Sequence, residues 1–205
     1  MKLGIIGTGV VGKTIAARLA GLGHEVMVGT RDPEQTLSRT EPGAYGTPPF
    51  GSWQEEHPEV KLGTFEEAAA HGEMVVSATA GGVSLEALEL AGEDNLSGKI
   101  LMDVANPLDF SRGMPPTLAV SNTDSLGEQI QRRFPAAKVV KTLNTMNAYL
   151  MVDPAQLPER PTAPCSLAAT TRRQSKRYQS CSEASVEPNC QLRRHHDCSV
   201  CCRRD

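Results

Sequence analysis

Short apolar runs alternate with stretches of helical periodicity along most of the chain. Apolar runs of strand length occupy residues 3–6, 26–28, 60–62, 74–78, 100–104 and 138–143. Between them, apolar positions recur every three or four residues over residues 13–20, 64–70, 84–90 and 126–134. A continuous apolar run such as residues 74–78 is typical of a strand that is buried on both faces. Strands that alternate with helices at this spacing predict an α/β fold, a Rossmann-type doubly wound parallel sheet.

Polar residues mark where three of these helices are expected to begin. Thr64 is expected to cap the helix that follows it, because two glutamates stand in the first turn. Ser84 is expected to cap the next helix, and Thr123 with Asp124 announces the last one. These signals place the helix starts more firmly than apolar spacing alone.

A glycine-rich turn, residues 7–12, directly follows the first apolar run. In such a turn Gly7 allows a tight bend, Gly9 lets the backbone approach a pyrophosphate, and Gly12 lets the helix pack close to the strand. The phosphates would meet the partial positive charge of a helix N-terminus. Strand, turn, helix and second strand fit within about 30 residues, the size of a βαβ unit. The pattern predicts dinucleotide binding by Gly7, Thr8, Gly9, Val10, Val11 and Gly12.

The end of the second strand indicates which dinucleotide is bound. An NAD site usually has an acidic residue there, which accepts hydrogen bonds from the ribose 2′-hydroxyl. This chain has Thr30 and Arg31 instead, and a guanidinium can bind a 2′-phosphate through two charge-assisted hydrogen bonds. We therefore expect NADP, with Thr30 and Arg31 at the 2′-phosphate. The alternative is that Arg31 is a solvated loop cation and Asp32 is the ribose-binding acid.

Residues 32–59 are rich in proline, glycine and threonine and are expected to form one long loop. It contains Tyr45, Phe50 and Trp53, the only tryptophan. Such a loop could fold over the adenosine end of the cofactor, or its aromatic side chains could pack against the flank of the domain.

Small or amide-bearing residues follow the later strands of the predicted sheet. In doubly wound sheets, ligands bind outside the carboxyl ends of the strands. Ala78 and Thr79 stand at one such end, and Asn106 and Asn144 stand at two others. We expect these four residues to flank the nicotinamide and its ribose, although asparagine also ends strands through ordinary turn chemistry.

Overall composition is that of an ordinary globular protein, with 39% hydrophobic and 22% charged residues. The sequence has no run of 18 or more apolar residues and no signal-peptide pattern, so no membrane partner and a cytoplasmic location are expected.

Charge and cysteine are distributed unevenly. Residues 1–159 carry 12 Lys and Arg against 20 Asp and Glu, a net charge of −8, whereas residues 160–205 carry 9 against 4, a net charge of +5. All six cysteines lie in this second segment, at Cys165, Cys181, Cys190, Cys198, Cys201 and Cys202. Two such different compositions suggest segments of different origin or environment.

Four segments make residues 1–158 similar to the coenzyme F420-dependent NADP oxidoreductases, also called NADPH-dependent F420 reductases. They are residues 2–12, 23–31, 103–107 and 139–145. In the last of these, Thr142 and Leu143 stand where the family more often has Ala or Gly and Phe. The resemblance implies a domain of residues 1–158 that binds NADP. Ferric reductases and pyrroline-5-carboxylate reductases share this domain.

The resemblance also implies direct hydride transfer between NADP(H) and the deazaflavin of coenzyme F420, its co-substrate. Such a step needs no catalytic side-chain acid or nucleophile, because proximity and orientation of two rings can contribute about 7 to 11 kcal/mol. We accordingly expect a small-molecule substrate and assign no catalytic residue and no metal site. Alternatives are a non-catalytic NADP-binding module or an inactive truncated product, and a different acceptor, such as ferric ion or another small substrate. The family also suggests a homodimer, which the altered C-terminus would weaken.

After Pro158 the chain departs from the family, which continues there with elements of the acceptor pocket and the dimer. Residues 159–205 have no apolar periodicity, so we expect an irregular, disordered tail rich in cysteine and arginine. Its thiols would more often be free than bridged in a reducing cytoplasm.

Three hypotheses account for this tail. The cluster of histidines and cysteines in residues 195–202 could bind a metal, although the upstream cysteines offer no second Cys-x-x-Cys pair. The nine cations could bind nucleic acid, but only one aromatic residue accompanies them. The favoured hypothesis is a frameshift, which would truncate the acceptor half. With permitted synonymous codons, residues 193–199 read one base later spell Gly-Asp-Ile-Thr-Thr-Ala-Arg, which resembles the family's C-terminal segment.

Overall fold

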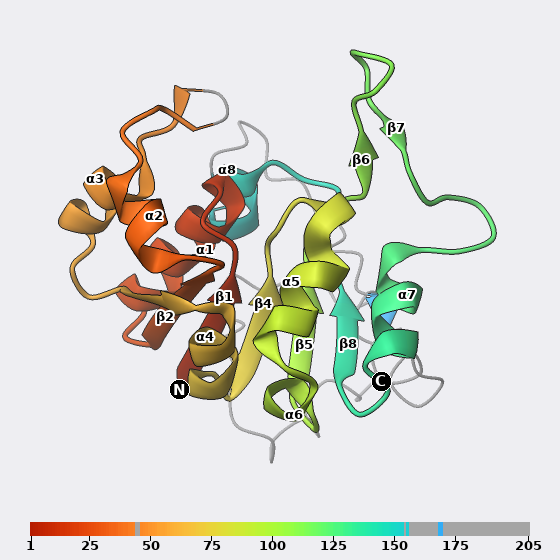
Figure 1. The fold of residues 1–205 in the computed structure, drawn as a ribbon, viewed down its shortest axis with the longest axis horizontal. Helices are drawn as coiled ribbons and strands as arrows, with labels where there is room; N and C mark the ends of the chain where they lie inside the picture. Colours follow the sequence, from red (N-terminus) through yellow and green to blue (C-terminus); the bar gives the residue numbers. More distant parts are fainter. Residues whose placement is uncertain (44–45, 154, 156–167, 170–205) are drawn as a thin grey trace, which may run out of the picture.

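A seven-stranded sheet forms the centre of the computed structural model, which describes residues 1–43, 46–153, 155 and 168–169 (Figure 1). Its strand order is β3-β2-β1-β4-β5-β8-β9, and the first six strands run parallel. They are β1 (Lys2–Ile6), β2 (Glu25–Thr30), β3 (Lys61–Thr64), β4 (Met74–Ser77), β5 (Ile100–Asp103) and β8 (Lys138–Lys141). The predicted Rossmann-type α/β fold is confirmed. The strand order reverses between β1 and β4, where such sheets bind ligands.

Helices cover both faces of the sheet. On one face lie α4 (Phe65–His71), α5 (Ser84–Ala91), α6 (Glu93–Leu96) and α7 (Leu126–Arg133), around buried residues such as Leu88, Leu101 and Phe134. On the other face, α1 (Val10–Gly21), α3 (Phe50–Glu56) and α8 (Ala148–Val152) pack around Ile5 and Val28. Because both faces are buried, the strands could be read from the sequence as nearly continuous apolar runs.

The expected loop over residues 32–59 is instead partly helical. Asp32 caps α2 (Pro33–Ser38), with its Oδ1 accepting a hydrogen bond of 2.9 Å from the Gln35 amide, and Pro33 occupies the favoured first helical position. In α3, Phe50 and Trp53 are buried in the core with ring centroids 5.1 Å apart. The loop prediction failed because these helices are too short to show periodicity, and α3 is stabilised by tertiary burial.

The predicted helix caps have mixed outcomes. Thr64 forms a full capping box with Glu67, as its position before two glutamates suggested. Ser84 is wrong as a cap, because it is the first residue of α5 and its hydroxyl faces the Ala80 carbonyl oxygen at 3.3 Å. Ser125, rather than Thr123 or Asp124, caps α7 by accepting from the Glu128 amide.

Several short elements were not foreseen. They are a 3-10 turn η2 (Gly81–Val83), α6, α8, and the hairpin of β6 (Leu108–Asp109) and β7 (Thr117–Leu118), which projects beyond the sheet in Figure 1. Ala168–Ala169 form β9, antiparallel to β8, where no strand was predicted. Otherwise, the expectations for residues 159–205, including the metal, nucleic-acid and frameshift hypotheses, fall outside the described residues.

A buried ion pair joins the carboxyl ends of two neighbouring strands. Asp103 at the end of β5 is fully buried, and its Oδ2 lies 2.8 Å from Nζ of Lys141 at the end of β8. Lys141 also donates to the Ala105 carbonyl oxygen, and Asp103 Oδ1 accepts the Ala105 amide at 3.1 Å. The pair therefore holds the start of the loop after β5 in place.

Replacing Lys141 with methionine should strongly destabilise the protein, because the Asp103 carboxylate would stay buried without its partner. We expect a loss of about 3 kcal/mol in the free energy of unfolding, measured by urea denaturation. Lys138→Met at the exposed start of the same strand is the matched control and should change stability little. Equal losses in the two variants would show that the ion pair contributes nothing specific.

Candidate functional site

The glycine turn adopts the geometry that a dinucleotide site requires. Gly7 has φ of +119°, which favours glycine, and its amide donates to the Gly29 carbonyl oxygen at 3.0 Å. A Cβ on Gly12 would collide with the Gly7 carbonyl oxygen. The first glycine therefore makes the bend and the last one brings α1 against the end of β1, as their spacing suggested.

The middle glycine leaves open space in front of the helix. Gly9 is the N-cap of α1, and a Cβ built on it would meet nothing within 4 Å. The first helical hydrogen bond runs from the Lys13 amide to the Gly9 carbonyl oxygen at 3.0 Å, so the amides of Val10, Val11 and Gly12 precede it. Amides at a helix start bind phosphate. The residues present fit a pyrophosphate.

Loops that are far apart in the sequence meet beside this turn. A Cβ on Gly7 would lie 2.8 Å from the Ala78 carbonyl oxygen, and the Ala78 amide donates to the Ile6 carbonyl oxygen at 2.9 Å. A Cβ on Gly81 would collide with the backbone of Asn106. The ends of β1, β4 and β5 are thus in direct contact, as expected for parallel neighbours.

The two predicted asparagines bind each other across the ends of β5 and β8. Asn106 Nδ2 donates to the Asn144 carbonyl oxygen at 2.6 Å, and Asn144 Nδ2 donates to Asn106 Oδ1 at 3.1 Å. The Asn106 carbonyl oxygen also accepts the Gly81 amide at 3.2 Å. Asn147 instead caps α8, with Oδ1 accepting the Tyr149 amide at 2.9 Å. Asn106 and Asn144 therefore join two loops, whereas Asn147 has a local capping role.

Two hydroxyl groups lie at the end of β4. The Thr79 hydroxyl lies 2.9 Å from that of Ser84, which links the loop to α5. Ser77, one residue before Ala78, is fully buried, and its hydroxyl has no hydrogen-bond partner among the described residues. Sequence reasoning missed Ser77, because a serine inside an apolar run carries no signal of its own.

The expected 2′-phosphate residues stand together at the end of β2. Thr30 is 8% exposed and its hydroxyl lies 2.8 Å from that of Thr36, which donates to the Asp32 carbonyl oxygen at 2.7 Å. Arg31 is exposed, and its Nη2 lies 2.7 Å from Glu86 Oε1. Arg31 is therefore reachable from solvent, while Thr30 supports α2. Asp32 Oδ1 caps α2, and the alternative that Asp32 binds the ribose stays a prediction.

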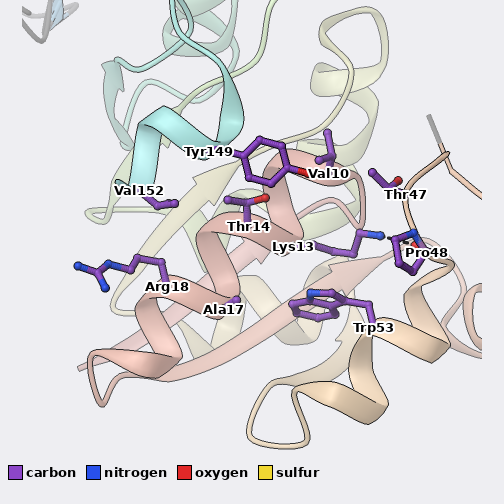
Figure 2. Close-up of a pocket in the computed structure, with 10 residues that line it drawn as sticks. All are labelled: Val10, Lys13, Thr14, Ala17, Arg18, Thr47, Pro48, Trp53, Tyr149 and Val152. Atoms are coloured by element: carbon purple, nitrogen blue, oxygen red, sulfur yellow. Dashed lines mark hydrogen bonds between the residues drawn. The ribbon is translucent and has the colours of Figure 1, made fainter. Parts of the chain in front are cut away.

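Two hollows lie beside α1. The larger of the two, of about 440 Å³, runs along α1 from Val10 to Arg18, between α3 and α8 (Figure 2). Trp53 and Tyr149 line it from opposite sides of the helix, and Val10 is the one predicted site residue in its wall. A smaller hollow of about 150 Å³ touches the glycine turn at Thr8, Gly9 and Val10. In the sequence, the helical spacing of Val10, Thr14 and Ala17 could have shown that these residues share one face of α1, the face that lines the larger hollow.

Lys13 lies between the two hollows and is only 6% exposed. It follows the last glycine, where phosphate-binding loops of nucleoside triphosphatases carry a lysine. Here the ammonium donates to the Pro48 carbonyl oxygen (Figure 2), and burial lowers the pKa of Lys13 below its usual 10.5. The lysine therefore ties the segment before α3 to α1.

No group of His, Cys, Asp and Glu suited to a metal ion occurs among the described residues. Within the same part of the chain, no helix is long and apolar enough to cross a membrane.

Comparison with known proteins places the chain among NADP-dependent reductases. Residues 2–107 match the family described as coenzyme F420-dependent NADP oxidoreductase. A solved structure of a candidate F420-dependent NADP reductase from Arthrobacter sp. FB24 is 54% identical with a TM-score of 0.80, over 89% of this chain and 79% of that one.

Two further relatives are more distant. Metalloreductase STEAP3 of Rattus norvegicus is 31% identical over 151 residues, which cover 73% of this chain and 26% of that protein. The chain thus spans about a quarter of the length of this curated relative. An imine reductase of Streptomyces aurantiacus, 18% identical with a TM-score of 0.51 over 90% of this chain and 52% of that one, shares the fold alone.

Gly9→Ala should separate cofactor binding from folding. The new methyl group meets no protein atom, so the free energy of unfolding should change by no more than about 1 kcal/mol, the cost of a poorer N-cap. NADPH affinity should fall about tenfold or more, because the methyl group fills the space that the pyrophosphate needs. Fluorescence titration and urea unfolding measure the two quantities.

Gly12→Ala is the informative contrast, since its methyl group collides with Gly7 and should lower both stability and affinity. Gly21→Ala, at the open end of α1, should lower neither. Undiminished NADPH binding by Gly9→Ala would refute the assignment of the turn to the pyrophosphate.

Proposed function

Because this chain belongs to the coenzyme F420-dependent NADP oxidoreductase family, we propose that it transfers hydride between NADP(H) and coenzyme F420. The observation that carries the proposal is the open, Cβ-free start of α1 next to an exposed arginine at the end of β2. Together they offer sites for a pyrophosphate and for a 2′-phosphate.

In this proposal residues Gly7, Thr8, Gly9, Val10, Val11 and Gly12 hold the pyrophosphate through backbone amides. Arg31 binds the 2′-phosphate with its guanidinium. Thr30 has a supporting role, because its hydroxyl is hydrogen-bonded to that of Thr36 and holds the start of α2 in place. We assign the phosphate contact to Arg31 and the supporting role to Thr30, because Arg31 is exposed and Thr30 is buried.

Ala78, Thr79, Asn106 and Asn144 are proposed to flank the nicotinamide end. The mutual hydrogen bonds of Asn106 and Asn144 give that wall a fixed shape. The Asp103–Lys141 pair below them holds the loop that carries Asn106. Bound NADPH supplies the hydride, and the contribution of this chain is to orient the ring, for which no acid or nucleophile is required.

The relatives point to two candidate electron acceptors. The family description and the Arthrobacter relative name F420, whereas the rat relative is named a metalloreductase. Ferric ion is therefore the second candidate acceptor, and a module that binds NADP without catalysis is the third candidate function. A cytoplasmic location, a homodimer and the division into a domain of residues 1–158 and a tail stay predictions.

Arg31→Gln should weaken NADPH binding about 10- to 100-fold, which corresponds to the loss of one or two charge-assisted hydrogen bonds. NADH binding should stay unchanged, since NADH has no 2′-phosphate. Isothermal titration with both cofactors measures the ratio. Arg133→Gln, which removes an exposed arginine paired with Glu89, is the control. Similar affinities of the unaltered protein for NADH and NADPH would exclude the role given to Arg31.

Mixing the NADPH-loaded protein with oxidised F420 in a stopped-flow spectrometer should bleach the visible band of the deazaflavin. Ferric citrate in place of F420 tests the second acceptor through ferrous-chelator absorbance. Tight NADPH binding without reduction of either acceptor would favour the non-catalytic module.

A further inference from the structure

An acidic side chain holds the arginine proposed to bind the 2′-phosphate. Glu86 Oε1 lies 2.7 Å from Arg31 Nη2, although 55 residues separate the two in sequence. Arg31 follows the end of β2, and Glu86 lies in the first turn of α5. The pair therefore joins the loops on the two sides of β1, the strand that carries the glycine turn.

The Glu86 carboxylate occupies an N–H group of Arg31 for which a phosphate would compete. A guanidinium donates to a phosphate through the same N–H groups that it offers to a carboxylate. A dianionic 2′-phosphate on Arg31 would have Glu86 as a like-charged neighbour on the same guanidinium, so the existing pair must open or weaken when NADP binds.

Opening this pair costs little. The side chains of Arg31 and Glu86 are 64% and 57% exposed, and such surface pairs contribute little to stability because water screens them. A 2′-hydroxyl carries no charge and has no comparable means of displacing the carboxylate. The exchange of partners is thus available to NADP and unavailable to NAD.

We propose that Glu86 is a specificity-determining residue that competes with the 2′-phosphate for Arg31 and so limits the affinity for NADP(H). This inference rests on the proposed function, because it requires Arg31 to bind the 2′-phosphate. Glu86 occupies the guanidinium until NADP(H) displaces it, and the competition lowers the affinity for the phosphorylated cofactor alone.

The test is a titration of NADPH and NADH into five variants, Arg31→Gln among them, and the unaltered protein. Glu86→Gln frees Arg31 and should tighten NADPH binding about two- to fivefold, with NADH unchanged. Glu86→Lys places a second cation beside the 2′-phosphate and should tighten NADPH about tenfold. In the double variant Arg31→Gln/Glu86→Gln, the glutamate substitution should have no effect beyond that of Arg31→Gln.

Glu89→Gln is the matched control. Glu89 lies on the same helix, is similarly exposed and pairs with Arg133 at 2.9 Å, so its loss changes net charge equally without touching Arg31. Equal effects of Glu86→Gln and Glu89→Gln, a change shared by NADH, or weaker NADPH binding after Glu86→Gln would each overturn the proposal. The last result would instead mean that Glu86 orients Arg31 for the phosphate.

The variants distinguish failure of the Arg31 role from failure of the Glu86 competition. If Arg31→Gln leaves the NADPH-to-NADH ratio unchanged, the proposed role of Arg31 fails. If Arg31→Gln weakens NADPH alone while Glu86→Gln behaves like Glu89→Gln, the cofactor assignment stands and the competition is excluded.

Discussion

The packing of α1 against the end of β1 is the constraint on which the candidate site depends. At Gly12 the helix lies so close to the Gly7 carbonyl oxygen that no side chain fits between them. This approach brings the start of α1 to the edge of the sheet where the strand order reverses. The helix amides and the dipole of α1 then point at the space in front of Gly9, which has no Cβ to fill it. A larger residue at any of these three glycines would disturb either the bend, the opening or the approach.

Parallel pairing brings the other candidate residues to the same edge. Since β1, β4, β5 and β8 run in one direction, the residues that follow them become neighbours whatever their separation in sequence. Local contacts then determine the shape of that edge. The Asp103–Lys141 pair holds the ends of β5 and β8, and the Asn106–Asn144 hydrogen bonds continue the same connection one step outward. The ion pair and the asparagine pair therefore both connect the loop after β5 to the loop after β8.

Sequence reasoning succeeded where a local pattern determines the structure. Strand runs, the roles of Gly7 and Gly12, and the capping box at Thr64 all follow from neighbours within a few residues. It failed where the deciding partner is distant or the signal short. Asp32 was read as part of a loop, yet it caps a six-residue helix. The contact between Arg31 and Glu86 could not be predicted from sequence spacing. It forms because β2, which precedes Arg31, and β4, which precedes the helix of Glu86, lie on either side of β1.

Electrostatics at the candidate site must be local, because the charge of the surrounding chain opposes an anionic cofactor. Residues 1–159 have a net charge of −8, which repels a dinucleotide at long range. At physiological ionic strength this repulsion is screened beyond about 8 Å, whereas direct hydrogen bonds to phosphate are not lost. In the proposed site, affinity therefore depends on a few groups in contact with the cofactor, for which we propose the first amides of α1 and the guanidinium of Arg31. In such a setting we expect a single carboxylate at 2.7 Å from that guanidinium to influence cofactor choice more than the many acidic residues elsewhere.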